Sequence, residues 1–252
     1  MEPEIFSTFN ATKLYRGAYD YFENGKQYST ESFEIFENKQ EHFYYFKADV
    51  LGRAPTGEVL SFKIDYKISS RYAPIAVRVE KHLGKRKAVE TYTFDVKENL
   101  VKYNFFSEDE MGEIELHTKH KIHIATPAIC TSLLFLKSKR FQNTGVNTFV
   151  TLVSHNRWKY EGEPERRGIS IERISGTPID IFMGGKRLKC VKYQMKGQDL
   201  TSEVTDQTIE KDVPFLDLYL SKHLTIPYRI TDPQGNKLYE MKYFNYLVDS
   251  ER

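Results

Sequence analysis

Apolar and polar residues alternate along most of the chain with the two-residue period of half-buried β-strands. The clearest stripe lies in residues 60–68, where Leu60, Phe62, Ile64, Tyr66 and Ile68 share one face. Turn signals separate these runs at the spacing of about 8–12 residues that is typical of an all-β fold. The pattern predicts strands at residues 15–22, 28–36, 42–50, 59–68, 75–80, 91–96, 100–106, 114–124, 146–155, 157–160, 169–174, 179–183, 188–196, 200–209, 215–220, 226–230 and 237–248.

Several connections have distinct turn chemistry. Asn24-Gly25 and Gly184-Gly185 each lie between alternating runs, which predicts tight hairpins. Residues 52–57 and 162–168 are predicted to be polar loops. Pro227 lacks a backbone N–H and therefore indicates an edge or bulged position in its strand.

One stretch, residues 126–141, departs from the alternating pattern and predicts an amphipathic helix. Thr126 is a favourable N-cap and Pro127 suits the first helical position. Ile129, Leu133, Phe135 and Leu136 fall on or beside one apolar face, and cations gather in the last turn. We expect this helix to cover or plug a curved sheet.

These elements predict a mainly β fold. We expect a large antiparallel meander that curls into an open or half barrel, with the helix of about 126–141 packed on or in it. A chain of 252 residues with 40% hydrophobic residues can bury a core of this kind. We expect a single β domain over 1–252, or two fused sheet halves (about 1–125 and 146–252) joined by the helix.

The composition argues against several kinds of binding partner for this protein. Lys and Arg (37) nearly balance Asp and Glu (35), giving a net charge of +2, so no strong field favours nucleic acid. No apolar run approaches the ~18 residues of a membrane helix. Cys130 and Cys190 lack the number and spacing of a disulfide framework or metal site, and we expect Cys130 to be a buried free thiol.

Candidate catalytic motifs are sparse. His117, His120 and His123 invite a metal hypothesis, but on one strand His120 faces opposite to the other two, so we expect no metal. The sequence has no nucleophile elbow or phosphate-binding loop, and carboxylates such as Glu34, Asp65 and Glu172 cannot be paired from one sequence. We therefore predict no catalytic residues and no cofactor.

The abundant aromatic residues, 17 Tyr and 17 Phe, suit either a filled core or the wall of an apolar cavity. We predict a binding or carrier protein for a lipid or another hydrophobic small molecule. The ligand would contact Phe62, Ile64, Tyr66, Tyr92, Phe94, His120, Leu133 and Leu136. Two alternatives stay open: an enzyme with His120 as general base, and an interaction protein with a filled core that recruits partners at its sheet edges.

The order of the predicted elements is similar to that of a known group of proteins. A meander with the Gly25 hairpin, the helix 126–141 and a closing segment with Ile-Pro-Tyr-Arg-Ile at 226–230 resembles certain uncharacterised bacterial envelope β-proteins. Those proteins are similar to the lipoprotein-localisation-factor type of open barrel. The resemblance implies an incomplete barrel around a helical plug that holds a hydrophobic molecule. Met1–Glu4 is no secretory leader, so the chain reads as soluble, or as periplasmic where a leader has been removed.

Overall fold

The alternating pattern folds into strands throughout most of the chain. We describe a computed structural model, which covers residues 4–8, 10–118, 122–137, 145–154, 158–183, 185–199, 215–221 and 225–247. The strands are β1 (Thr12–Glu23), β2 (Lys26–Asn38), β3 (Phe43–Arg53), β4 (Val59–Ser69), β5 (Pro74–Leu83), β6 (Arg86–Asp95), β7 (Leu100–Ser107), β8 (Met111–His117), β9 (His123–Ala125), β10 (Val146–Val153), β11 (Arg166–Arg173), β12 (Ile179–Met183), β13 (Lys186–Asp199), β14 (Leu216–Leu220), β15 (Pro227–Thr231) and β16 (Lys237–Tyr246). Short 3₁₀ helices occur at η1 (Glu4–Phe6), η2 (Ile129–Thr131) and η3 (Leu134–Lys137).

The strands form one continuous curled sheet. Its order is β8-β7-β6-β5-β4-β3-β2-β1-β16-β15-β14-β13-β11-β10-β9, and β12, off this path, pairs with β13. Neighbours are antiparallel except for β9 and β10, which are parallel. Because β8 and β9 end the path without pairing to each other, the sheet stays open. The predicted mainly β fold with a curled antiparallel meander is therefore confirmed.

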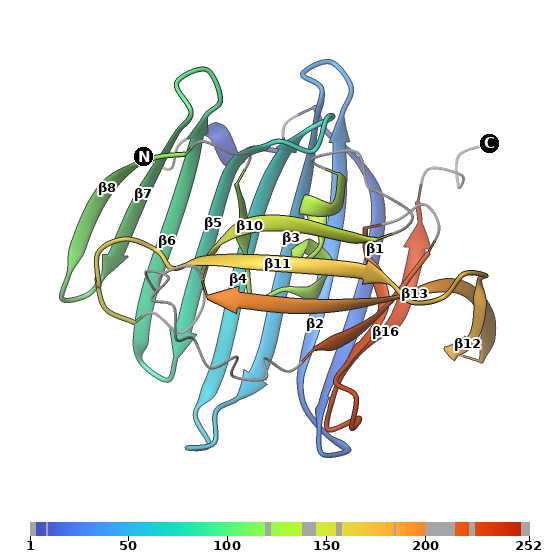
Figure 1. The fold of residues 1–252 in the computed structure, drawn as a ribbon. Helices are drawn as coiled ribbons and strands as arrows, with labels where there is room; N and C mark the ends of the chain where they lie inside the picture. Colours follow the sequence, from blue (N-terminus) through green and yellow to red (C-terminus); the bar gives the residue numbers. More distant parts are fainter. Residues whose placement is uncertain are drawn as a thin grey trace, which may run out of the picture.

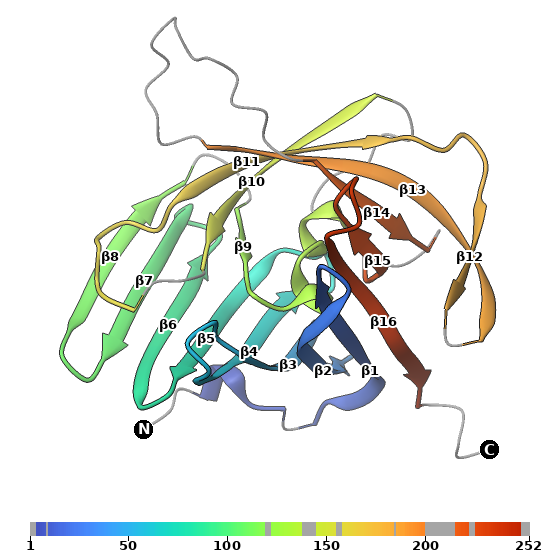
Figure 2. The same cartoon turned by 90° about the horizontal axis from the view of Figure 1, so that it is seen from below.

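The sheet folds over on itself to make two layers. Strands β10, β11 and β13 cross in front of β2–β5 in Figure 1. The view from below shows β1–β8 as one curved wall, with β10, β11 and β13 spanning the opposite side (Figure 2). The helical turns η2 and η3 lie between these two layers in Figure 2.

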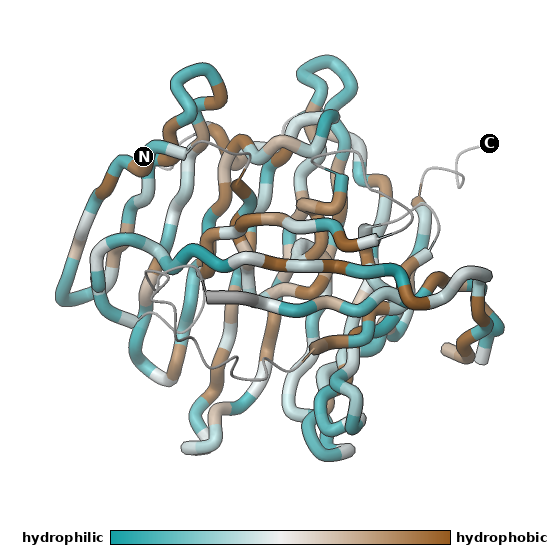
Figure 3. The backbone as a smooth tube through the Cα atoms, viewed as in Figure 1, coloured by the Kyte–Doolittle hydropathy of each residue, from teal (hydrophilic) through white to brown (hydrophobic). Residues whose placement is uncertain are grey.

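The core fills much of the space between the layers. Along β4, the side chains of Phe62, Ile64, Tyr66 and Ile68 are buried while the intervening residues are more accessible. Apolar and polar segments alternate along the strands in Figure 3, whereas the long hairpin turns are mostly polar. One apolar cluster contains residues from both sides of the chain's midpoint, for example Tyr66 of β4 and Leu218 of β14.

The helical segment occupies the predicted place but has a different form. Instead of a regular amphipathic helix, the described part of 126–141 contains the two 3₁₀ turns η2 and η3. The segment buries not only Leu133 and Leu136 but also Cys130, Leu134 and Phe135. It therefore has no broad polar face toward solvent. Residues 138–141 lie outside the described residues. A segment enclosed on several sides does not need the single apolar stripe of a surface helix.

Local turn predictions are largely confirmed. Asn24 and Gly25 have positive φ values of 51° and 74° in the β1–β2 turn, and Gly185 has φ 74° between β12 and β13. Pro227 pairs with Leu220 where the register between β14 and β15 shifts, so it sits at a bulge as predicted.

Other boundaries were wrong. The predicted strand 114–124 is two strands, β8 and β9, that lie at opposite ends of the sheet. Residues 158–160 are irregular rather than extended in a ladder, and the predicted strand 200–209 lies outside the described residues. The predicted loops 52–57 and 162–168 are shorter, because β3 continues to Arg53 and β11 begins at Arg166. Arg53 and Arg167 therefore lie on strands and not in loops.

Candidate functional site

A cavity of about 610 Å³ lies between the two layers of the folded sheet. Strands β2, β3 and β4 supply one wall, and β11, β13, β14 and β15 supply the opposite one. Residues 125–132, which include η2, line it between these walls. Its apolar lining residues are Val50, Leu60, Phe62, Val153, Met195, Leu216 and Ile230, with Pro127 and Ile129 from the helical segment.

A buried carboxylate fixes the helical part of this lining. Glu31 is 1% exposed and points from β2 toward the start of η2. Its Oε2 accepts the backbone N–H of Ile129 at 2.6 Å, and its Oε1 accepts that of Cys130 at 3.0 Å. The Tyr21 hydroxyl donates to the same carboxylate. Glu31 thus satisfies N–H groups that the start of a helical turn leaves unpaired.

The surroundings of Glu31 and Cys130 shift the pKa values of both groups. Burial raises the pKa of Glu31, while the hydrogen bonds from Tyr21, Cys130 and Ile129 act in the opposite direction. Burial, followed by the nearby Glu31 charge, raises the pKa of the Cys130 thiol well above its usual range. Cys130 is therefore a protonated, buried free thiol, as predicted, and it lacks the thiolate character of a nucleophile.

Three tyrosines form an aromatic corner of the cavity. Tyr21, Tyr28 and Tyr239 all line it. The ring of Tyr21 meets that of Tyr239 edge-on, with centroids 4.9 Å apart, and that of Tyr28 at 6.1 Å. Burial raises the pKa of Tyr28, and the nearby Tyr239 raises it further. The three hydroxyls give an otherwise apolar cavity a polar side.

The charged lining residues are both cationic. Arg53, at the end of β3, is exposed, and the Arg167 side chain on β11 is 39% exposed, so this part of the cavity reaches solvent. Among the described residues, the lining set contains no Asp, Glu, His, Cys or Lys. A wall of this kind can bury apolar surface and hold a polar group.

The predicted ligand contacts are distributed differently. Phe62 lines the cavity, whereas Ile64, Tyr66, Tyr92, Leu133 and Leu136 are packed in the buried core. Phe94 is partly buried against that core, and His120 lies outside the described residues. Sequence reasoning missed Arg53, Arg167 and the tyrosine corner. Their signal was weak, because the two arginines were assigned to loops and the tyrosines come from three separate strands.

The histidine-rich stretch does not form a described metal site. His117 is exposed at the end of β8, whereas His123 is 2% exposed in β9, with Nδ1 3.3 Å from the Tyr66 hydroxyl. In the described ranges, no group of three or more His, Cys, Asp or Glu side chains is placed to hold a metal ion. Likewise, no helix within the described residues is long and apolar enough to cross a bilayer.

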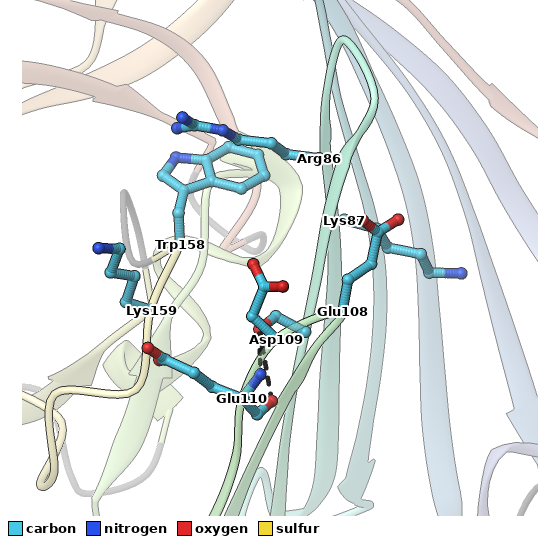
Figure 4. A pocket seen from close by; sticks show the side chains of 8 residues that line it. Arg86, Lys87, Glu108, Asp109, Glu110, Trp158 and Lys159 are labelled. Carbon is cyan, nitrogen blue, oxygen red and sulfur yellow. Dashed lines mark hydrogen bonds between the residues drawn. The ribbon is translucent and has the colours of Figure 1, made fainter.

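A second, smaller hollow is highly charged. It measures about 140 Å³ and is lined by the start of β6, the end of β7 with the β7–β8 turn, and residues 158–159. In Figure 4 the side chain of Arg86 runs beside the Trp158 ring, and the Glu108 and Asp109 carboxylates lie below them. Glu110 accepts the backbone N–H of Tyr160 at 2.7 Å. Its small size and mixed charges make this hollow a poorer candidate than the larger cavity.

Comparison with known proteins gives the fold but not a family. No protein-family model and no curated protein matches the sequence. Among solved structures, the chain is similar to a DUF1089 family protein from Pseudomonas aeruginosa, with 8% identity, a TM-score of 0.48, and 79% of this chain and 87% of that chain covered.

A second structure matches over a longer stretch. It is the β-barrel-like protein of the domain of unknown function DUF1849 from Brucella abortus, with 6% identity and a TM-score of 0.58. The match covers 93% of this chain and 98% of that chain. The chain therefore shares a β-barrel-like fold with the Brucella protein over nearly the full length of both.

Proposed function

We propose that the protein is a non-enzymatic binding protein that holds a lipid or another hydrophobic small molecule in the cavity between its two sheet layers. The observation that carries this proposal is the cavity of about 610 Å³ with its apolar walls. This volume falls in the range of roughly 300–1,000 Å³ that is usual for small-molecule sites. Binding would be driven by burial of apolar ligand surface, worth about 25 cal/mol per Å² before the costs of association.

The wall residues have distinct parts in this proposal. Leu60 and Phe62 on β4 and Met195 on β13 would touch the ligand, because they line the cavity from opposite layers. Tyr66, Tyr92 and Leu133 are fully buried, so they would support this wall from the core rather than meet the ligand directly. The sequence resemblance to uncharacterised bacterial envelope β-proteins implies an open barrel that holds a hydrophobic molecule, and the similar Brucella protein supports the barrel-like fold alone.

A pair of tryptophan substitutions on one strand tests the proposal. Leu60→Trp places a large ring in the cavity, whereas Lys63→Trp places the same ring at an exposed position of β4. We expect Leu60→Trp to weaken binding of a neutral lipophilic fluorescent probe at least about tenfold, the loss that removal of a well-packed contact causes. Lys63→Trp should bind like the wild type. Equal binding by both folded variants would contradict the proposal.

A protein partner at a sheet edge is the second candidate function. Among the described strands, β12 pairs only with β13, and its Phe182 is 72% exposed. Edge strands with exposed apolar side chains can add a strand from another chain. A second copy of the protein is the simplest such partner. Sedimentation over a dilution series would show self-association that Phe182→Lys abolishes; a monomer at all concentrations would contradict this candidate.

A further inference from the structure

We propose that the ligand of this cavity is an anionic amphiphile, with its carboxylate or phosphate headgroup on Arg167 and its apolar tail between the sheet layers. This inference rests on the proposed binding function. It starts from the charge of the lining, which among the described residues contains two arginines and no acidic residue; Glu165 pairs with Arg167 but does not itself line the cavity. The whole chain is nearly balanced, with 37 basic and 35 acidic residues, so the excess is particular to this cavity.

The strand register directs Arg167 toward the apolar tail site. Alternate residues of a strand share a face, so Arg167 lies on the same face of β11 as Ile169 and Ile171. Both isoleucines belong to the buried core cluster. Arg167 is therefore an inward-facing cation at the accessible end of an inward-facing apolar stripe. Arg166, its neighbour in sequence, lies on the opposite face and does not line the cavity.

Arg167 is held in place but keeps donors available. Its Nε and Nη2 donate to a single oxygen of Glu165, at 3.2 and 2.7 Å. A guanidinium has five N–H donors, and in the part of the chain that the structure describes Nη1 of Arg167 makes no hydrogen bond. The Glu165 contact orients the planar group, and the remaining N–H donors can bind the two oxygens of a carboxylate or phosphate.

Arg53 adds a second cation from the opposite wall. It ends β3, and its Nη1 donates to the backbone oxygen of Gly57 at 3.1 Å. The accessible part of the cavity thus has a guanidinium group on the β3 side and another, paired with Glu165, on the β11 side. Val50, Phe62 and Ile230 supply apolar surface. This combination suits a molecule that is charged at one end and apolar along the rest.

Matched ligands with one common chain test the inference. We suggest calorimetric titration with dodecanoate, dodecyl phosphate and dodecanol, each below its aggregation concentration, and with inorganic phosphate alone. The wild type should bind dodecanoate or dodecyl phosphate at least about tenfold more tightly than dodecanol, because a hydrogen bond to an ionised group adds about that much. Inorganic phosphate should bind far more weakly than either.

Arginine variants locate the headgroup. Arg167→Gln should remove most of the preference for the anionic ligands and leave the affinity for dodecanol unchanged, and Arg53→Gln should reduce the preference in the same direction. Arg166→Gln is the matched control and should change neither affinity. If Arg167→Gln fails to fold, the comparison of wild-type affinities for the anionic ligands and for dodecanol still tests the inference.

The outcomes separate this inference from the proposed function. Equal affinity of the wild type for dodecanol and both anions would overturn the anionic headgroup while retaining hydrophobic binding. Inorganic phosphate that binds as tightly as dodecyl phosphate would also overturn it, since the tail would then contribute nothing. If none of the three dodecyl ligands binds, the proposed function itself fails.

Discussion

Glu31 on β2 accepts the backbone N–H of Ile129 at 2.6 Å, across 98 positions of sequence, and so ties the first turn of the helical segment to the sheet. The acceptor and the donor are both buried, and Ile129 lines the cavity. A buried N–H that loses its acceptor carries the full cost of its desolvation. The shape of this side of the cavity therefore depends on one carboxylate.

Replacing this carboxylate with an amide should destabilise the protein. In Glu31→Gln a single carbonyl oxygen must serve donors that the two carboxylate oxygens now share, so at least one buried donor loses its acceptor. We expect the free energy of unfolding near neutral pH to fall by about 1–3 kcal/mol. Urea denaturation measures this change. Glu34→Gln, on the outer face of the same strand, should remain close to the wild type.

The pH dependence of stability should change in the same variant. Because burial raises the pKa of Glu31 above its ordinary 4.5, the folded protein keeps this proton to higher pH than the unfolded chain does. The contribution of Glu31 to stability is therefore fullest below pH 4.5 and declines as the pH rises through the folded-state pKa. The free energy of unfolding should be measured against pH for the wild type and for Glu31→Gln, and the difference between the two curves should show this decline. Parallel curves would contradict a raised pKa of Glu31 in the folded protein.

A buried ion pair joins β5 to β6. Lys81 and Glu90 have fully buried side chains, with Nζ 2.7 Å from Oε2, and Glu90 also accepts the hydroxyls of Tyr103 and Ser154. Lys81→Met should lower the free energy of unfolding by about 3–5 kcal/mol, because it leaves a buried carboxylate without its cation. Denaturation by guanidinium chloride measures the loss.

A double variant distinguishes charge from packing in this pair. Lys81→Met combined with Glu90→Gln removes both charges. The amide carbonyl can accept one of the Tyr103 and Ser154 hydroxyls and the amide N–H can donate to the other, so we expect the double variant to regain part of the lost stability. Lys102→Met, in the exposed Lys102–Glu115 pair, should leave the transition midpoint nearly unchanged. A double variant less stable than Lys81→Met alone would show that packing, not the lone charge, caused the loss.

We also propose that the two sheet halves form one folding unit. β1 pairs with both β2 and β16, which joins the first strands to the last. Trp158, which follows β10, lines the small hollow with Arg86 and Ser107, so its fluorescence should report contact between the halves. We expect fluorescence and far-ultraviolet circular dichroism to give one coincident transition. Separate midpoints would indicate two units.

The sequence predicted the sheet well because its signals are local. The Asn24-Gly25 turn and the alternation of residues 60–68 each lie within a few neighbouring residues. The spacing of Ile129, Leu133 and Leu136 correctly predicted burial but suggested a regular helix, because periodicity cannot show that Cys130 and Leu134 are enclosed as well. Strand order also could not be read, as the separation of β8 from β9 shows.

The cavity was harder to predict because its parts are distant in sequence. Tyr21, Phe62, Arg167 and Tyr239 come from four strands that meet only once the sheet has folded over. One signal was present: Glu31 shares a strand face with Phe33 and Ile35, and a carboxylate on an apolar face needs buried partners. The identity of those partners, the N–H groups of Ile129 and Cys130, required the fold.

The most direct test of the central claim is native mass spectrometry of the gently purified protein, followed by solvent extraction of any released molecule. Bound hydrophobic ligand should appear as one added mass per chain, be lost in Leu60→Trp and be retained in Lys63→Trp. The extract should contain an amphiphile. A wild-type mass equal to that of the chain alone, with no uptake of any dodecyl ligand, would contradict the claim that this cavity is a binding site.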